Sequence, residues 1–207
     1  MTRLRLGRRS LTIRFVAAAA LALSLAGCAS VAGLFTPTPV AYDLAAAKRF
    51  PRHPGPARGQ LVIVEPSVLG PFDGTAVVIR PAPGEAARLS GVQWEDRLPR
   101  LMQARLIQSF ENASWLHAVG SPSDNIAADF VLRTELRAFE MSVTDGAAVV
   151  EIAAKIVDQR SGRIVAARVF HVAAPAESVQ GPDAIAAINQ AFVKAASELV
   201  LWAARVV

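Results

Sequence analysis

One thiol stands in the whole chain, and its surroundings indicate the chemistry that it could undergo. Cys28 follows an uncharged run, residues 15–27, which is rich in alanine and leucine. Five arginines lie before that run, and the first acidic residue of the chain is Asp43. A thiolate is a strong nucleophile. Because no second cysteine is present, an internal disulfide is impossible, and the sulfur is free to accept another group.

The residues before this cysteine are typical of an export signal. A basic region, a short apolar core and small residues form the layout of a secretory signal peptide. The core is shorter than the roughly 20 apolar residues that a membrane span needs. Leu25-Ala26-Gly27-Cys28 resembles the bacterial lipobox, in which cleavage falls between Gly27 and Cys28 and the sulfur receives a diacylglyceryl group. We therefore expect a lipoprotein signal peptide over 1–27 and acyl chains such as palmitate on Cys28.

Two other interpretations of the leader remain open. It could be an ordinary secretory signal, cut after a small-residue pair, with Cys28 incidental. It could also stay attached as an N-terminal anchor, because no charge lies between Arg14 and Asp43. Gly33, Pro37 and Pro39 disfavour a single helix through that stretch.

The charge balance changes once the leader is set aside. The chain has 22 Lys and Arg against 17 Asp and Glu, a net charge of +5 and a pI near 10.3. The five leader arginines account for the whole excess. A basic pI can indicate a nucleic-acid-binding surface, but the remaining domain is neutral. We therefore predict no nucleic-acid partner.

The rest of the chain divides into a tether and one domain. Residues 28–41 are small, uncharged and contain two prolines, which predicts a tether that holds the domain away from a membrane. Residues 42–207 are long enough for a single domain with its own core. The proline-rich stretch 48–59 is predicted to be a loop.

Apolar periodicity predicts the elements of that domain. Buried or alternating runs predict strands, and spacings of three and four predict helices. The strands are expected at 60–66, 75–81, 88–93 and 115–119, and one helix at 95–113, with Trp94, Leu98, Leu101, Met102, Leu106 and Phe110 on its apolar face.

One long strand and a hairpin are predicted in the second half. Residues 128–143 alternate, with Phe130, Leu132, Leu136 and Ala138 on one side and Arg133, Glu135 and Arg137 on the other. The apolar phase shifts at Phe139 and Met141, which predicts a bulge or a twist near Ala138. Residues 147–158 and 163–174 flank a Gln-Arg-Ser-Gly turn and form an antiparallel hairpin.

The C-terminal segment, residues 183–207, is predicted to be a core helix. Its apolar stripe consists of Ile185, Ile188, Phe192, Ala195, Leu199, Trp202 and Val206. Lys194, Glu198 and Arg205 argue against a membrane span. The order of the elements predicts an α+β fold, a mostly antiparallel sheet with two main helices packed on one face, preceded by the signal peptide and tether.

The motifs that carry enzymatic or cofactor chemistry are missing from the sequence. It has no glycine-rich phosphate loop, no His-Glu-x-x-His, no cysteine pair and no Gly-x-Ser-x-Gly. His53, His117 and His171 fall on separate predicted elements. We therefore predict that the chain is not an enzyme and has no catalytic residue, metal site or cofactor. An envelope hydrolase is disfavoured for want of a nucleophile constellation.

The order of several stretches resembles a known family. After the lipobox come Tyr42-x-Leu44, LVIVEPSVL (61–69), FDGTAVVIR (72–80) and VQWEDRLPRLMQARLIQSF (92–110). With the strands and the final helix that follow, they resemble the ABC-type transport auxiliary lipoproteins. Trp94-x-x-x-Leu98 at the entry to the first helix carries much of the likeness.

The resemblance implies a function in the bacterial envelope. Members of that family accompany MCE-type transporters, which move phospholipid or sterol between the two membranes. The expected partners are an MCE-domain protein with its permease and ATPase, and the membrane through the lipid anchor. Ala29 follows the lipidated cysteine, and lipoproteins without Asp at that position are commonly sorted to the outer membrane. The alternative is a structural or assembly lipoprotein of another outer-membrane or cell-wall machine.

Overall fold

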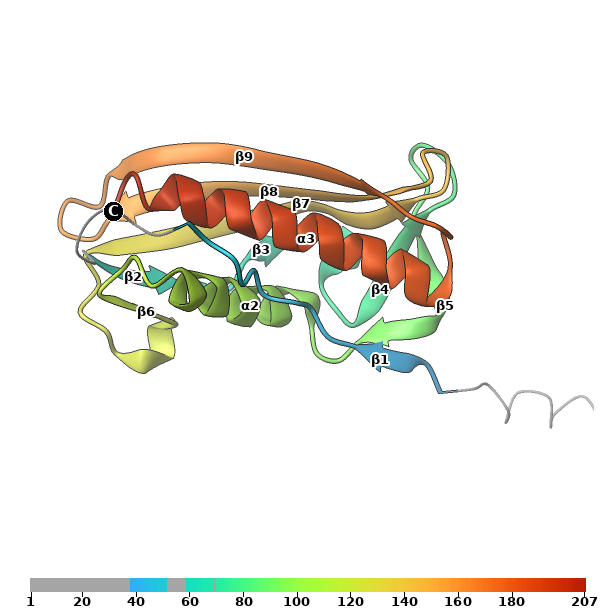
Figure 1. The fold of residues 1–207 in the computed structure, drawn as a ribbon, viewed down its shortest axis with the longest axis horizontal. Coiled ribbons are helices and arrows are strands. Elements are labelled where there is room, and N and C mark those ends of the chain that lie inside the picture. Colours follow the sequence, from blue (N-terminus) through green and yellow to red (C-terminus); the bar gives the residue numbers. More distant parts are fainter. Residues whose placement is uncertain (1–37, 52–58, 69) are drawn as a thin grey trace, which may run out of the picture. The chain divides into compact units, whose positions relative to one another are not determined.

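The computed structural model describes residues 38–51, 59–68 and 70–207. The elements below all belong to the compact unit Pro39–Val207. In chain order they are β1 (Val40–Tyr42), β2 (Gln60–Ile63), β3 (Ser67–Val68), the 3-10 turn η2 (Gly70–Phe72), β4 (Ala76–Arg80), β5 (Ala87–Trp94), α2 (Leu98–Ala113), β6 (Ala118–Gly120), the 3-10 turn η3 (Pro122–Asp124), β7 (Phe130–Ser142), β8 (Ala147–Asp158), β9 (Ile164–Pro175) and α3 (Gly181–Ala203) (Figure 1).

Strand β7 is the centre of a curled sheet. Along one edge it pairs in succession with β2, β3 and β4, all parallel to it. Along the other edge it pairs with β8, and β8 pairs with β9, both antiparallel. Strand β5 extends the sheet beside β4 and pairs on its far side with β1, while β6 lies outside β2.

The prediction of a mostly antiparallel sheet was wrong, because the sheet is mixed. The pairs β1–β5, β2–β6, β2–β7, β3–β7 and β4–β7 are parallel, whereas β4–β5, β7–β8 and β8–β9 are antiparallel. The physical reason lies in α2, which separates β5 from the later strands. A parallel pair needs a crossover long enough to bring the chain back to its starting end. Helix α2 supplies that crossover, so β7 runs in the same direction as β2 and β4.

The three long strands confirm the hairpin and the bulge. The register of β7 against β8 shifts between Leu136 and Ala138, where the bulge was predicted. The shift moves Ala138 to the opposite face, paired with Glu151, so its predicted place beside Leu136 was wrong. A tight turn joins β8 to β9, with Gly162 at a φ of 68°. Asp158 accepts hydrogen bonds from the backbone and hydroxyl of Ser161, at 2.7 and 2.8 Å.

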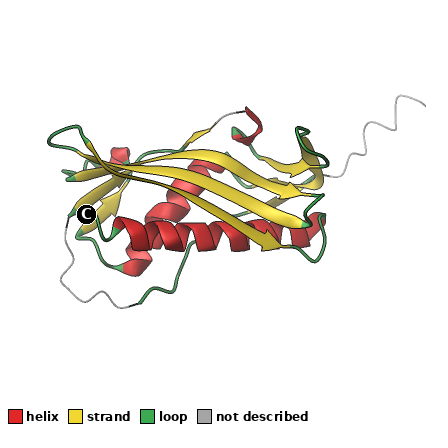
Figure 2. Ribbon diagram, turned by 90° about the horizontal axis from the view of Figure 1, so that it is seen from above, coloured by secondary structure: helices red, strands yellow, loops and turns green. Residues whose placement is uncertain are grey.

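Helix α3 runs along the three long strands and covers one face of β8 and β9 (Figure 2). Its length and composition alone would allow a membrane span, but its apolar side is packed against the sheet. The stripe residues Ile185, Ile188, Phe192, Ala195 and Leu199 are all buried, as predicted. Trp202 is only partly buried, and Val206 lies beyond the end of the helix. The stripe is therefore shorter than expected.

Helix α2 packs against α3 and against β2 and β6. It begins at Leu98 with Pro99 in the first turn, where the missing N–H of proline costs nothing. It ends at Ser114, whose φ of 57° turns the chain away from the helix axis. The predicted apolar face is confirmed, because Trp94, Leu98, Leu101, Met102, Leu106 and Phe110 are all buried.

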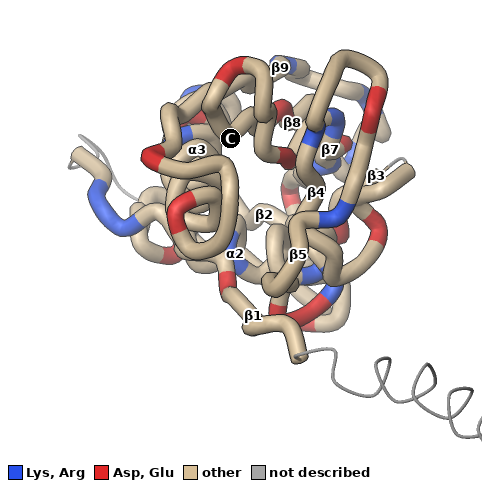
Figure 3. Tube along the Cα trace, turned by 90° about the vertical axis from the view of Figure 1, so that its right-hand side faces the viewer, with Lys and Arg blue, Asp and Glu red and all other residues tan. Residues whose placement is uncertain are grey.

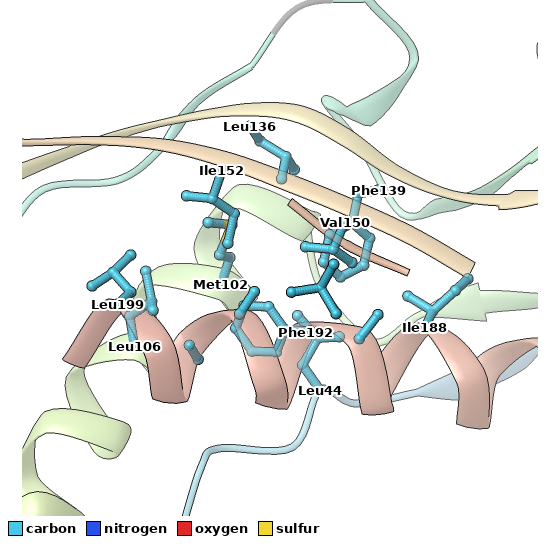
Figure 4. Close-up of a cluster of buried hydrophobic side chains, with 14 of the residues drawn as sticks. Leu44, Met102, Leu106, Leu136, Phe139, Val150, Ile152, Ile188, Phe192 and Leu199 are labelled. Carbon is cyan, nitrogen blue, oxygen red and sulfur yellow. The ribbon is translucent and has the colours of Figure 1, made fainter. Parts of the chain in front are cut away.

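One continuous core joins the two helices and the sheet. Met102 and Leu106 of α2, Phe192 and Leu199 of α3, and Val150 and Ile152 of β8 contribute to a single cluster (Figure 4). Phe139 connects the layers, because its ring meets Trp94 at 5.7 Å and Phe192 at 5.9 Å, both edge to face. Such pairs add about 0.5–1.5 kcal/mol each beyond their buried area.

Candidate anchoring and docking surfaces

The predicted lipidation residue, Cys28, and the cleavage residue Gly27 lie outside the described residues. The described chain starts at Thr38 and enters the domain at once through β1, which pairs with β5. The segment that follows, residues 43–47, is called the strap here. It runs across both helices.

The strap is fixed to the domain by side chains of both helices. On α3, Asn189 accepts a hydrogen bond from the Ala45 amide at 2.8 Å and donates one to the Asp43 carbonyl at 3.3 Å. On α2, Ser109 accepts from the Ala47 amide at 3.0 Å, and Asn112 donates to the Ala47 carbonyl at 2.9 Å.

Two further contacts join the strap to α2 and to the core. The Asp43 carboxylate pairs with Arg105 of α2, and Leu44 is buried in the core cluster (Figure 4). Tyr42 and Leu44, which contributed to the family resemblance, therefore belong to the point where the N-terminal segment is held. The strap is therefore attached directly to the core of the domain.

A second cluster gathers the FDGT and WEDRLP stretches. Arg97, directly before α2, pairs with Asp73 from the loop before β4 and with Glu65 from the loop after β2, the latter at 3.2 Å. Hydrogen bonding and charge from Asp73 raise the pKa of Arg97 above its ordinary value. The Leu98 amide donates to the Gly74 carbonyl at 2.9 Å. Together these contacts hold three chain segments at the start of α2.

The face of β7–β9 that points away from α3 carries a third group of polar residues. Arg137 pairs with Glu135 at 3.1 Å and lies 3.9 Å from Glu151. His171 of β9 lies 3.1 Å from the other oxygen of Glu151. Seen along the long strands, the basic and acidic residues of the domain are interspersed (Figure 3). This network is a solvated sheet face, as the alternation of β7 predicted for Glu135 and Arg137.

A buried ion pair lies at the margin of the same face. Glu140 of β7 pairs with Arg80 of β4, and the Glu140 side chain is only 8% exposed, against 33% for Arg80. The other carboxylate oxygen of Glu140 has no hydrogen-bond partner within the described ranges. The pair joins two parallel strands at the position where Val78 lies beside Glu140 in the register.

The concavities of the domain are small and lie among loops and strand ends. One holds about 530 Å³ and is lined by Ala128, Asp129, Phe130, Asp158, Gln159 and Arg160. A neighbouring one of about 440 Å³ shares Ala128 and Gln159 with it. Within the part of the chain that the structure describes, no group of three His, Cys, Asp or Glu residues could hold a metal ion. His117 and His171 lie on different strands or loops, and His53 lies outside the described residues.

These features define the class of the domain. It is an α+β domain in which a curled mixed sheet and two helices pack around one core. Residues 43–47 are hydrogen-bonded to side chains of both helices. One face of the β7–β9 strands and the β9 edge are exposed, as are parts of both helices.

The family follows from comparison with known proteins. The family described as "ABC-type transport auxiliary lipoprotein component" matches residues 42–200, which is most of the domain. The chain belongs to this family. The resemblance stated from the sequence is therefore confirmed. The family is one of auxiliary lipoproteins of ABC transport systems rather than of known enzymes, and it implies a lipid-anchored location in the envelope.

Relatives and solved structures support the assignment. "Uncharacterized protein bll6063" of Bradyrhizobium diazoefficiens is 35% identical over 185 residues, covering 86% of this chain and 48% of that protein. The chain thus spans about half the length of the curated relative that it matches. The crystal structure of XCC0632 from Xanthomonas campestris is 26% identical, with a TM-score of 0.67, over 81% of this chain and 94% of that one.

A second crystal structure, of an uncharacterized protein, shows the fold alone. It has a TM-score of 0.61 at 18% identity and covers 82% of this chain and 98% of that one.

The sequence did not reveal the strap or the Arg97 cluster. Both depend on partners far apart in the chain, such as Ala45 with Asn189 and Arg97 with Glu65. A signal was present in the quoted motifs, since Asp73 and Arg97 both lie in stretches that carried the family resemblance. Spacing alone could not show that the two side chains meet.

Proposed function

We propose that the chain is the accessory lipoprotein of an MCE-type ABC lipid transport system and binds the MCE protein in the bacterial envelope. The observation that carries this proposal is the match of residues 42–200 to the auxiliary lipoprotein family of ABC transport systems. The domain's proposed contribution is to bind and position its partner, as the family's auxiliary role suggests. The cargo would be a phospholipid or a sterol.

The proposed attachment is through Cys28. Residues 1–27 would be the signal peptide, 28–41 the lipidated tether and 42–207 the auxiliary domain. Two or three acyl chains give stable membrane attachment where one chain is marginal. The strap supports this division, because it fixes the end of the tether to both helices. With Ala29 after the cysteine, the proposed location is the periplasmic side of the outer membrane.

Tethering lowers the affinity that the domain needs. A short flexible linker raises the local concentration of a partner to about the millimolar range. Weak binding by the free domain is therefore compatible with a stable complex at the membrane. The matched pair for a test is the full-length chain and its Cys28→Ser variant, which is expected to lack the lipid anchor and to keep the signal peptide.

The test is affinity purification of the full-length protein from its native envelope, with mass spectrometry of the proteins that accompany it. We expect the MCE protein, the permease and the ATPase with the lipidated protein, and a marked loss of all three with Cys28→Ser. Recovery of cell-wall synthases or secretion components, without an MCE protein in any of several detergents, would contradict the proposal and favour an assembly lipoprotein.

Anchoring and sorting are tested separately from partnership. Cys28→Ser is expected to leave an uncleaved precursor with altered membrane fractionation. Ala29→Asp is expected to move the protein to the inner membrane in bacteria that use that sorting rule. Normal processing and fractionation of Cys28→Ser would rule out the lipid anchor while leaving the partner test intact.

A further inference from the structure

Strand β9 is an unusually exposed edge. It pairs with β8 alone within the described residues, so one side of its backbone is open over twelve residues. Of the five large apolar side chains that are exposed in the described chain, three belong to this strand: Ile164 at 57%, Val165 at 48% and Val169 at 48%. A long apolar edge strand is a ready template for pairing with another chain.

Two cations without carboxylate partners lie inward of this edge on the face away from α3, one on the neighbouring strand β8 and one on β7. Arg133 of β7 is directly opposite Lys155 of β8 in the register, and both side chains are exposed. Like charges in directly opposed positions destabilise an antiparallel pair. Neither cation has a carboxylate within 4.0 Å among the described residues, because the neighbouring Glu135 and Glu65 are paired with Arg137 and Arg97.

The two cations border a hollow of the right size for an acidic side chain. The hollow holds about 210 Å³ and is lined by both cations, by Ser67 of β3 and by Ala153 of β8. Its two carboxylates are the ones already paired with other arginines. The hollow therefore has two positive charges that no carboxylate neutralises, and a bound anion would reduce the repulsion between them.

Arg133, Lys155 and the residue opposite Lys155 on β9 form a row across three strands, which is called the Arg133–Lys155 row and reaches the open edge. Lys155 lies opposite Ala167 of β9, whose side chain is a single methyl group. Neighbouring strands are about 4.8 Å apart, so a Glu or Asp on a strand added next to β9 could reach Lys155 across Ala167. On the other face, Arg168 is exposed and lies over the Phe170 ring, 5.0 Å from its centre. Each face of an added strand would thus meet a cation.

We propose that β9 and the Arg133–Lys155 row form a docking surface for an extended segment of a partner protein, one that carries both apolar and acidic residues and adds a strand to the sheet. Apolar positions of that segment would lie beside Ile164 and Val169, and its acidic positions near Lys155 and Arg168. Main-chain hydrogen bonds would supply affinity, and the cations would select the segment. The surface rests on the proposed function only for the identity of the partner.

The direct test places a photo-crosslinking amino acid at Val169 in the full-length protein, in cells that contain its native envelope. The probe is the crosslinker itself, and the crosslinked peptide is sequenced by mass spectrometry. The matched control carries the same group at Val143, an exposed apolar residue after β7. We expect the Val169 position to capture an acidic, extended segment of another protein, and the Val143 position not to capture it.

A charge reversal tests whether the two cations select the segment. Arg133→Glu with Lys155→Glu is expected to lower the crosslinking yield at Val169 about tenfold, and added salt is expected to weaken the wild-type crosslink. The control is Arg88→Glu with Lys194→Glu, two exposed cations elsewhere, for which the yield stays within about twofold. All four positions are exposed, and unchanged thermal unfolding confirms that each protein folds.

The outcomes separate this surface from the proposed function. An acidic segment from a protein unrelated to MCE systems supports the surface and contradicts the MCE partnership. A crosslink to lipid, to a second copy of this chain or to a segment without Asp and Glu overturns the docking proposal, as does the lack of any crosslink at Val169. Equal loss of yield in both double variants overturns the selection by Arg133 and Lys155.

Discussion

The two faces of strand β8 differ in burial and charge, although alternate residues of one segment form them. The side toward α3 carries Ala148, Val150, Ile152, Ala154 and Ile156, none of them more than 1% exposed. The opposite side carries Glu151, which is in an ion-pair network, and Lys155, which is exposed. The same alternation continues into β9, where Phe170 and Val172 are buried and Val169 and His171 are exposed.

The difference separates what holds the fold together from what remains available to a partner. Burial of an apolar side chain contributes about 1.5–3 kcal/mol, whereas an exposed ion pair contributes about 0–1 kcal/mol. The face against α3 therefore determines stability, and its residues have little freedom to change. The uncovered face contributes little to folding, so its apolar and basic residues are better explained by contact with another molecule.

The largest expected change in stability comes from a substitution on the face of the sheet that α3 covers. Phe192 is fully buried in α3 and meets Phe139 edge to face. Phe192→Ala is expected to lower the free energy of unfolding by about 3–5 kcal/mol, because it leaves a cavity in the core. Val169→Ala, on the uncovered edge, should change it by less than about 0.5 kcal/mol. Denaturant unfolding of both variants measures the contrast, and similar losses would contradict it.

The next effect concerns the margin between the faces. Arg80→Met would leave the buried Glu140 carboxylate without its cation. Breaking a fully buried pair costs about 3–5 kcal/mol, and the partial exposure of Arg80 reduces this to about 2 kcal/mol. A second change, Glu140→Met, should restore much of the stability, since the isolated charge is then gone. The thermal unfolding of the single and double variants decides the point: a double variant less stable than the single one would show that the pair itself is needed.

A smaller effect is expected at the end of α3. Trp202 is partly buried and meets Phe170 edge to face at 5.6 Å. Trp202→Ala is therefore expected to cost about 1–2 kcal/mol, less than full removal of a buried aromatic residue. Denaturant unfolding beside Phe192→Ala ranks the two positions. If Trp202→Ala is the more damaging, the end of the helix matters more to the core than its middle.

The smallest expected effect is at the β8–β9 turn on the uncovered side. Hydrogen bonds from Ser161 hold the pKa of Asp158 below its ordinary value of 3.8. A carboxylate with a lowered pKa stabilises the fold above the unfolded value, and that contribution is lost as the pH falls through the folded value. Asp158→Asn should thus lower the melting temperature slightly at pH 7 and by less at pH 3. An equal difference at both values would mean that charge is irrelevant there.

Local patterns in the sequence predicted the elements that are determined by the residues of one continuous segment. The hairpin of β8 and β9, the bulge near Ala138 and the stripe of α3 from Ile185 to Leu199 all follow from periodicity within one segment. Trp202 shows the limit of this reasoning. It has the correct spacing for the stripe and its ring meets Phe170, yet it remains partly exposed near the end of α3, and spacing alone does not show how completely a neighbouring strand covers a residue.

Pairing between distant segments was beyond the same reasoning. The parallel partners of β7 are short strands far earlier in the chain, and their direction depends on the path of α2 rather than on their composition. The row of Arg133, Lys155 and Ala167 likewise exists only after three strands are in register. Alternation showed that Arg133 faces solvent, and it could not show that a second cation lies opposite.

The division between a covered face that folds and an uncovered edge that binds is tested most directly by hydrogen–deuterium exchange. The comparison is between the full-length lipoprotein alone and the same protein within its purified envelope complex. The account predicts that amides of β9 exchange more slowly in the complex, because an added strand takes up their open hydrogen-bonding positions, and that amides of α3 are unchanged. Unchanged exchange in β9, with new protection confined to α3 or to β1 and β5, would contradict it.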